Sequence, residues 1–153
     1  MTWTIWLIVD SLALVAMRKE GALNAQITGA VVGTFAVTTL TLFFGTLSFG
    51  FIELVSIAGA LLGIVLWQAT GSAILAIVCS QATVLIGAIP TIVTAYHNPE
   101  SESPLAWSIW LLSCVFALLA VPKWNLAHAL QPITFTVLEG TMVYLVVIKP
   151  YWL

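Results

Sequence analysis

The stretch 72–96, SAILAIVCSQATVLIGAIPTIVTAY, decides the fold class of this chain. It contains no Asp, Glu, Lys or Arg, and it exceeds the roughly 20 apolar residues that a helix needs to cross a bilayer core of about 30 Å. Pro90 lies inside the stretch, where a proline kinks a helix or ends its regular part. The stretch therefore predicts a transmembrane helix, with Pro90 either as a hinge or as a purely structural kink.

The rest of the chain has the same character. Of its 153 residues, 61% are hydrophobic and only 7% are charged, whereas a soluble domain is about 25% charged. A water-exposed surface could not be built from so few polar residues. The net charge of −2 also argues against nucleic-acid binding, which requires a basic surface.

Five further apolar runs flank the first stretch, at 3–17, 24–45, 51–67, 105–121 and 126–148. Asn24 is placed as an N-cap, and Ser103 before Pro104 is a second cap with proline at the first helical position. The pairs of glycines at 29 and 33 and at 59 and 63 are spaced for close helix contact. We therefore expect an all-α membrane protein with six transmembrane helices in a single domain, 1–153.

The basic residues favour one orientation. If all six segments span, Arg18, Lys19 and Lys123 lie on one side, and Lys149 lies on the other with the acidic loop 97–104. The excess of basic residues then places the Arg18 loop in the cytoplasm. We expect an integral protein of a bacterial inner (plasma) membrane, with the lipid bilayer as its surroundings.

An internal repeat runs through the chain. Segment 2–17 (TWTIWLIVDSLALVAM) aligns without gaps with segment 106–121 (AWSIWLLSCVFALLAV), and seven of the sixteen positions are identical, including two tryptophans. One residue out of step, Gln26 aligns with Gln131. We expect repeat one at 2–46, a linker helix at 50–68 and repeat two at 72–148, with three helices in repeat two and no leading helix in repeat one.

The Pro90 helix, the polar loop with Ser101 and Ser103, and a helix that opens with Trp107 and Trp110 together resemble the PQ-loop superfamily, in its uncharacterised bacterial branch. That superfamily includes the SWEET sugar transporters. The resemblance implies a SWEET-like seven-helix plan that here lacks its first helix. The sequence departs from the family at the residue after the proline, which is threonine rather than glutamine.

Two carboxylates fall in the middle of predicted spans, Asp10 in the first and Glu139 in the sixth. A charge at mid-helix costs at least about 2.5 kcal/mol in lipid, so both must face a protein interior or a water-filled cavity. We expect both carboxylates to lie on a substrate path or to take part in proton coupling. The alternative is that they bind neighbouring helices as structural polar contacts.

Aromatic and amide side chains complete the candidate path. Trp6 and Trp110 lie one turn inside the predicted span ends. Gln81 lies deep enough in its predicted span to need a hydrogen-bond partner. Trp6 shares a helix face with Asp10, and Trp110 shares one with Cys114, which aligns with Asp10 in the repeat. The resemblance adds weight here, since SWEET-like proteins line their pockets with aromatic and amide groups. Trp3 and Trp107 fit an interfacial aromatic belt, and Glu102 fits a solvated loop.

Catalytic and metal-binding patterns are missing from the sequence. His97 and His128 have no metal-ligand spacing, and there is no serine–histidine–acid set or phosphate-binding glycine loop. We therefore expect no enzyme activity, no metal and no cofactor.

The leading hypothesis is a small PQ-loop-like transporter or permease for a polar solute, with proton linkage left open. It predicts a water-accessible cavity lined by Asp10 and Glu139. The alternative is a non-catalytic structural or assembly subunit of a larger membrane complex, which predicts an exposed surface rich in Trp and Phe and no path. The partners left open are a small polar solute, a second copy of the chain in a homo-oligomer, or other membrane-complex subunits.

Overall fold

The computed structural model describes residues 2–44 and 50–151, and in these residues the chain forms six α-helices. The helices are α1 (Thr2–Lys19), α2 (Ala25–Phe44), α3 (Phe51–Thr70), α4 (Ala73–His97), α5 (Pro104–Leu119) and α6 (Leu126–Val143). A 3-10 turn, η1 (Pro99–Ser101), precedes α5, while a π-helical turn, η2 (Tyr144–Ile148), and a 3-10 turn, η3 (Lys149–Tyr151), follow α6. The all-helical class and the six helical segments are as the sequence predicts. The predicted ends of the second run at 45 and of repeat one at 46 lie outside the described residues.

The helix starts follow the predicted capping chemistry. Asn24 accepts a hydrogen bond through Oδ1 from the backbone N–H of Ile27 at 2.9 Å, and Ser103 accepts one through Oγ from Ala106 at 3.3 Å. Each cap satisfies a backbone donor that the first turn of a helix leaves unpaired. Both predicted N-caps are confirmed.

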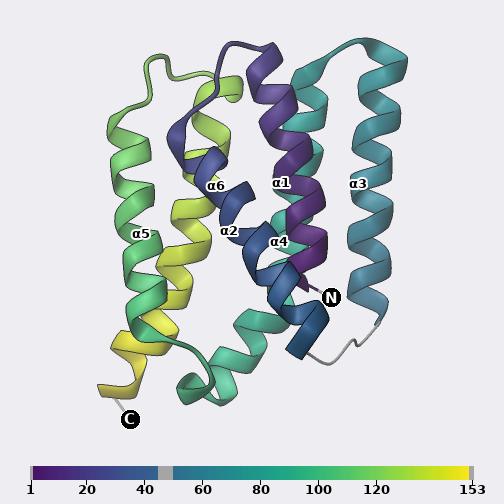
Figure 1. Cartoon of the computed structure of the whole chain (residues 1–153). Helices are drawn as coiled ribbons and strands as arrows, with labels where there is room; N and C mark the ends of the chain where they lie inside the picture. The colour runs from purple at the N-terminus through teal and green to yellow at the C-terminus, as the bar shows by residue number, and fades with distance from the viewer. Residues whose placement is uncertain (1, 45–49, 152–153) are drawn as a thin grey trace.

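Successive helices run in opposite directions (Figure 1). The N-terminus of α1 and the α4–α5 connection therefore lie at one end of the bundle, drawn as the lower end, and the α1–α2 and α5–α6 connections lie at the upper end. Lys149 donates a hydrogen bond to the carbonyl of Tyr96 at 2.6 Å, which ties η3 to the end of α4 at the lower end.

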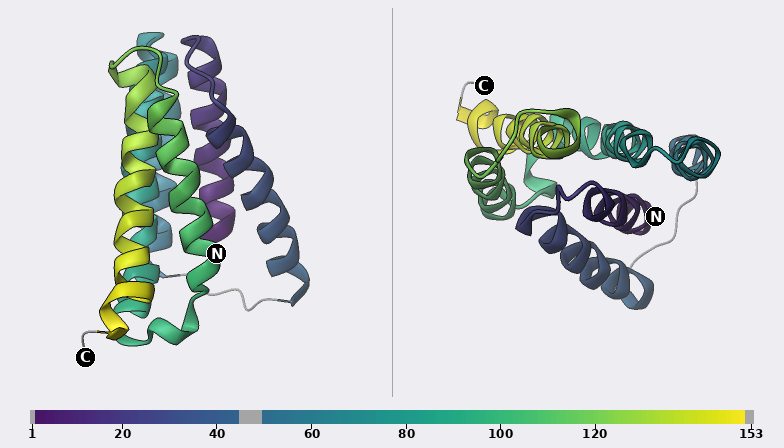
Figure 2. Two further views of the ribbon diagram at one scale, coloured as in Figure 1. Left: turned by 90° about the vertical axis from the view of Figure 1, so that its left-hand side faces the viewer. Right: turned by 90° about the horizontal axis from the view of Figure 1, so that it is seen from above.

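α4 packs against α1, α3 and α6, while α1 pairs with α2 and α5 pairs with α6. Seen from above, α6, α4 and α3 stand in a row, and α1 and α5 lie on the same side of that row (Figure 2). The two helices that begin with paired tryptophans therefore lie on the same side of this row.

Glycines let α3 approach α4 closely. A Cβ on Gly63 would lie 2.8 Å from the Cβ of Cys79, and one on Gly59 would lie 2.6 Å from the hydroxyl oxygen of Thr83. The close-packing prediction is confirmed at this pair. It is wrong for Gly29, around which no atom lies within 4 Å of the added Cβ, because Gly29 lies on the exposed side of α2.

Among the described residues, three helices are long and apolar enough to cross a membrane: α2, α4, and α6 with its π-helical turn (Leu126–Ile148). α3 from Leu54 and α5 are shorter apolar helices, and α1 carries Asp10, Arg18 and Lys19. The outer surface is densely apolar, with Phe44 85% exposed and Leu119 79% exposed. Such a surface is unusual for a soluble monomer and is consistent with a membrane protein.

Pro90 does not end its helix. α4 continues through Pro90 to His97, and its last turns slant toward the foot of α5 (Figure 1). A proline removes one helical hydrogen bond and crowds the preceding turn, so the slant fits a proline kink.

Candidate functional site

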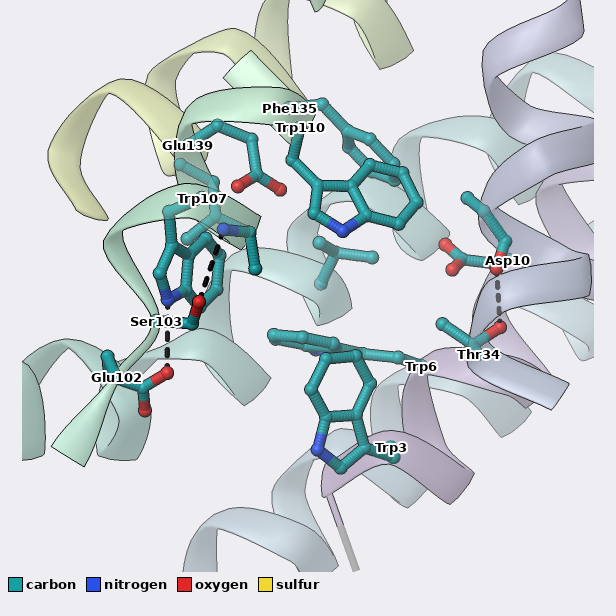
Figure 3. A pocket seen from close by; sticks show the side chains of 14 residues that line it. Trp3, Trp6, Asp10, Thr34, Glu102, Ser103, Trp107, Trp110, Phe135 and Glu139 are labelled. Carbon is teal, nitrogen blue, oxygen red and sulfur yellow. Dashed lines mark hydrogen bonds between the residues drawn. The ribbon is translucent and has the colours of Figure 1, made fainter. Parts of the chain in front are cut away.

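Five helices surround a pocket of about 130 Å³, which Figure 3 shows from close by. The lining side chains come from α1, α2, α4, α5 and α6 and from the α4–α5 connection: Trp3, Trp6, Asp10, Ala30, Thr34, Val84, Glu102, Ser103, Ala106, Trp107, Trp110, Phe135, Leu138 and Glu139. The helices α1 and α5, whose sequences align, therefore contribute to the same pocket.

The two mid-helix carboxylates both line this pocket. Asp10 is 3% exposed and Glu139 is 7% exposed. Within the described part of the chain, one carboxylate oxygen of each, Oδ1 of Asp10 and Oε2 of Glu139, is buried without a hydrogen-bond partner. Figure 3 shows the carboxyl groups on opposite sides of the pocket. Because a buried carboxylate oxygen without a donor is costly, this site favours a proton or a positively charged ligand.

Five aromatic side chains also line the pocket. Trp3 and Trp6 meet edge to face, with ring centroids 5.1 Å apart and an interplanar angle of 81°. Trp6 rests against α4 at Gly87, where an added Cβ would lie 3.1 Å from the indole nitrogen. Trp110 rests against α2 at Gly33, where an added Cβ would lie 3.5 Å from the ring. Glycine thus gives each of the two inner tryptophans the room it occupies.

The lower mouth of the pocket is fixed by an indole–carboxylate bond. Trp107 donates through Nε1 to Oε2 of Glu102 at 3.0 Å. Trp107 is buried and Glu102 is half-buried. The prediction of a solvated loop charge is therefore wrong for Glu102, because the start of α5 presents an indole N–H to it. Trp3 and Trp107, assigned to an interfacial belt, line the pocket instead.

A chain of side-chain hydrogen bonds crosses the bundle above the pocket. Asn24 donates to Oε1 of Gln131 at 3.0 Å, and Gln131 donates to Oε1 of Gln26 at 3.0 Å. Gln26 in turn donates through Nε2 to Cys114 Sγ at 2.9 Å and to Ser113 Oγ at 3.3 Å. We call these five residues the amide layer. It joins α2 and its N-cap to α5 and α6.

The amide layer lies one helical turn above the pocket. Gln26 precedes the pocket residue Ala30 by four positions, and Gln131 precedes Phe135 by four. Four residues of α-helix rise about 6 Å. Both α2 and α6 run downward in Figure 1, so the layer is displaced toward the upper end of the bundle.

A second hollow of about 280 Å³ lies on the other side of the amide layer, at the upper end. It is lined by Gly21, Ala22, Leu23, Asn24, Ala25, Ala117, Ala120, Val121, Pro122 and His128. His128 precedes Gln131 on α6 by about one turn, and Asn24 belongs to both the layer and this hollow. The two hollows thus approach the amide layer from opposite ends.

Four of the predicted path residues, Asp10, Glu139, Trp6 and Trp110, line the same pocket. Gln81 does not line it. Its amide is 2% exposed, and neither amide atom has a hydrogen-bond partner in the described residues. Gln81 lies three positions before the pocket residue Val84 on α4, hence about one turn nearer the amide layer. Pro90 lies further along α4 and is not among the pocket residues.

Thr34 also lines the pocket, but it donates to the carbonyl of Ala30 at 2.8 Å, so its hydroxyl proton is used within its own helix. Phe135 and Leu138 were not singled out from the sequence, and apolar residues on an apolar helix gave no signal that could have found them. The outer tryptophans were detectable, since each lies three positions from an inner one and so on the same helix face.

No group of three or more His, Cys, Asp and Glu side chains that could hold a metal ion occurs in residues 2–44 and 50–151. Comparisons with protein-family models, with curated proteins and with solved structures find no match to this chain. The resemblance to the PQ-loop superfamily therefore stays a prediction that rests on the sequence features quoted above.

Proposed function

We propose that this protein is a small PQ-loop-like membrane transporter or permease for a polar solute, with six spanning helices on a SWEET-like plan. One observation carries the proposal: two hollows lie toward opposite ends of the bundle, and one polar layer lies between them. A transporter that exposes its site alternately to each side needs this arrangement of site, gate and vestibule.

Helix packing is compatible with the proposed plan. In the proposed repeat two, α6 packs against both α4 and α5, which is compatible with a three-helix unit of 72–148, and α4 packs against α1 and α3 as well. In repeat one, α1 packs against α2 and against α3, the proposed linker. The site lies between these units, where α1 and α5 both contribute tryptophans, and transporters built from repeats place their substrates at such an interface.

The amide layer is the proposed gate. Its bonds are between neutral groups, and each such bond contributes only about 0.5–1.5 kcal/mol net. Opening the layer would therefore cost a few kcal/mol, which is the free-energy gap that separates major and minor states in switching proteins. Gln131 and Gln26 would part, and the pocket would then communicate with the upper hollow.

The carboxylates support proton linkage. Asp10 and Glu139 are buried, and each has an oxygen without a partner in the described residues. A proton on either group removes a charge from the membrane interior, so its binding and release would favour different states of the site. We assign Asp10 and Glu139 to substrate binding or coupling.

One surface feature favours the second candidate, a structural or assembly subunit of a membrane complex. α2 carries exposed aromatic rings at Phe35, Phe43 and Phe44, which are 62%, 76% and 85% exposed. Lipid can cover this surface, and so can another membrane protein. The proposed transport function requires only the former.

The test uses the full chain in liposomes. Uptake of labelled D-glucose, glycine and choline is measured with and without an inward proton gradient, beside protein-free liposomes. The transporter proposal expects saturable uptake of at least one solute. Absence of uptake for all three, with native mass spectrometry of gently extracted protein showing stoichiometric unrelated subunits, would overturn it and establish the subunit alternative.

A further inference from the structure

We infer that the pocket binds a small organic cation, an ammonium compound with about five to seven non-hydrogen atoms. The inference names the substrate class of the proposed transporter. Transport of this cation rests on the proposed function, whereas its binding can be tested alone. It stands on the charge, the aromatic surface and the size of the pocket.

The charged side chains that line the pocket all have the same sign. Of the described residues that line the pocket, three are acidic, Asp10, Glu102 and Glu139, and none is basic. Glu102 already accepts from Trp107, which leaves Asp10 and Glu139 as the groups with an unpaired oxygen. A cation between them would satisfy both, because buried charges are stable when they are paired. A neutral solute would leave both uncompensated, and an anion would be repelled.

The aromatic surface selects an organic cation over a metal ion. Four tryptophans line the pocket, and the indole face is the side-chain surface that attracts cations most strongly. In Figure 3, Trp110 and Trp6 approach the central space from above and below, and the carboxyl groups of Glu139 and Asp10 approach it from either side. Alkyl groups on a cation would contact the rings while its charge meets the carboxylates. A bare metal ion would need more oxygen ligands than this lining offers.

The volume sets the size of the ligand. The pocket measures about 130 Å³, slightly less than the roughly 150 Å³ cavity that holds benzene in another protein. A ligand of about five to seven non-hydrogen atoms therefore fits, with water in any remainder. Choline is a suitable probe, because its trimethylammonium group combines a diffuse charge with an alkyl surface.

The decisive experiment compares choline with 3,3-dimethylbutan-1-ol, in which a neutral tert-butyl group replaces the trimethylammonium group at almost the same shape. Binding to the purified full chain is measured by titration calorimetry and by tryptophan fluorescence. We expect choline to bind at least about tenfold more tightly than the alcohol, since only the cation gains from the rings and the carboxylates. Equal binding of the two, or no binding of choline, would overturn the inference.

Variants then test whether Asp10 and Glu139 cause the tighter binding of choline. Glu139→Gln and Asp10→Asn should each weaken choline binding at least about tenfold without weakening binding of the alcohol. Glu20→Gln, an exposed acid beyond the end of α1, is the matched control and should leave choline binding unchanged. If E139Q and D10N both bind choline as the unaltered protein does, the cation site is not in this pocket. Because the choline–alcohol comparison uses the unaltered chain, misfolding of a variant cannot decide the result.

The outcome also separates this inference from the transport proposal. Uptake of glucose or glycine without choline binding would preserve transport and overturn the cation inference. Choline binding without uptake of any solute would preserve the inference and overturn transport.

Discussion

Gln131 on α6 donates a hydrogen bond through Nε2 to Oε1 of Gln26 on α2 at 3.0 Å, and this bond lies between the two hollows of the bundle. Both side chains are buried, so neither amide can exchange its partner for water without a movement of the helices. Gln26 extends the connection to Cys114 on α5. One amide thus holds α6 and α5 together with α2 at the level where a solute would have to pass.

Replacement of Gln26 by leucine tests this arrangement. Leucine fills the space of the Gln26 side chain with an apolar group of similar size. It removes the hydrogen bonds to Gln131 and Cys114. Neutral bonds contribute about 0.5–1.5 kcal/mol each, so we expect the layer to open about tenfold or more often. The thiol of Cys114, which is 0% exposed, reports opening through its rate of reaction with a charged methanethiosulfonate reagent, in a C79A background where it is the remaining thiol.

Thr39→Val on the same helix is the control for the leucine variant. Thr39 is half-buried, and its hydroxyl donates to the carbonyl of Phe35 at 2.8 Å within α2, so its loss leaves the amide layer intact. Reaction of Cys114 at the same rate in Q26L and T39V would mean that the layer is not the barrier between the hollows.

Asp10→Asn tests proton coupling. The amide has the same shape as the carboxylate but cannot bind and release a proton. We expect proton-driven solute uptake in liposomes to fall at least about tenfold, whereas exchange of labelled for unlabelled solute without a gradient, measured at saturating solute, is retained. Glu100→Gln, an exposed acid in η1, should change neither rate. Proton-driven uptake at the unaltered rate in D10N would remove Asp10 from coupling.

The helices and their caps could be predicted from the sequence because they depend on local chemistry. A run such as 72–96 is long and apolar enough to be recognised as a candidate membrane span from the sequence. Asn24 and Ser103 cap their helices through hydrogen bonds to residues three positions away. The carboxylates Asp10 and Glu139 were also identifiable, because a charge in an apolar run must face the protein interior or water. These inferences need no knowledge of which helices are neighbours.

The amide layer and the pocket mouth could not be predicted in the same way. The bond between Gln26 and Gln131 joins residues 105 positions apart, and it depends on how α2 and α6 are rotated about their axes. An amphipathic helix shows its buried face in its sequence, but these helices are apolar on both faces. Trp107 and Glu102 illustrate the result, since an indole at a helix end looks the same whether it faces lipid or a carboxylate.

Gly63→Ala tests the close contact of α3 with α4. The added methyl group would lie 2.8 Å from the Cβ of Cys79, an atom that cannot move without the backbone. We expect a loss of about 1–3 kcal/mol of stability, as for other overpacked sites, measured by thermal unfolding in detergent. Gly29→Ala, with nothing within 4 Å, is the matched control and should be neutral or slightly stabilising because alanine favours helix. Equal melting temperatures for G63A and G29A would contradict the contact.

Side-specific labelling tests whether α3 and α5 cross the membrane. Single cysteines are introduced as E20C and S101C, both at exposed positions, in a C79A/C114A background, and are labelled from either side of the membrane. Three helices, α2, α3 and α4, separate these positions. If all three span, the two sites lie on opposite sides, with the position 20 site in the cytoplasm.

The same experiment is most informative for α3 and α5, which are not among the three candidate spans found in the described residues. Should α3 lie along the surface, only two spans would separate the sites, and both would be labelled from the same side. K123C extends the test, because only α5 separates it from the loop that holds Ser101. Six spans require position 123 to be labelled from the same side as position 20. Labelling of 123 and 101 from one side would mean that α5 does not cross, and the pocket between α1 and α5 would then lie at a membrane surface.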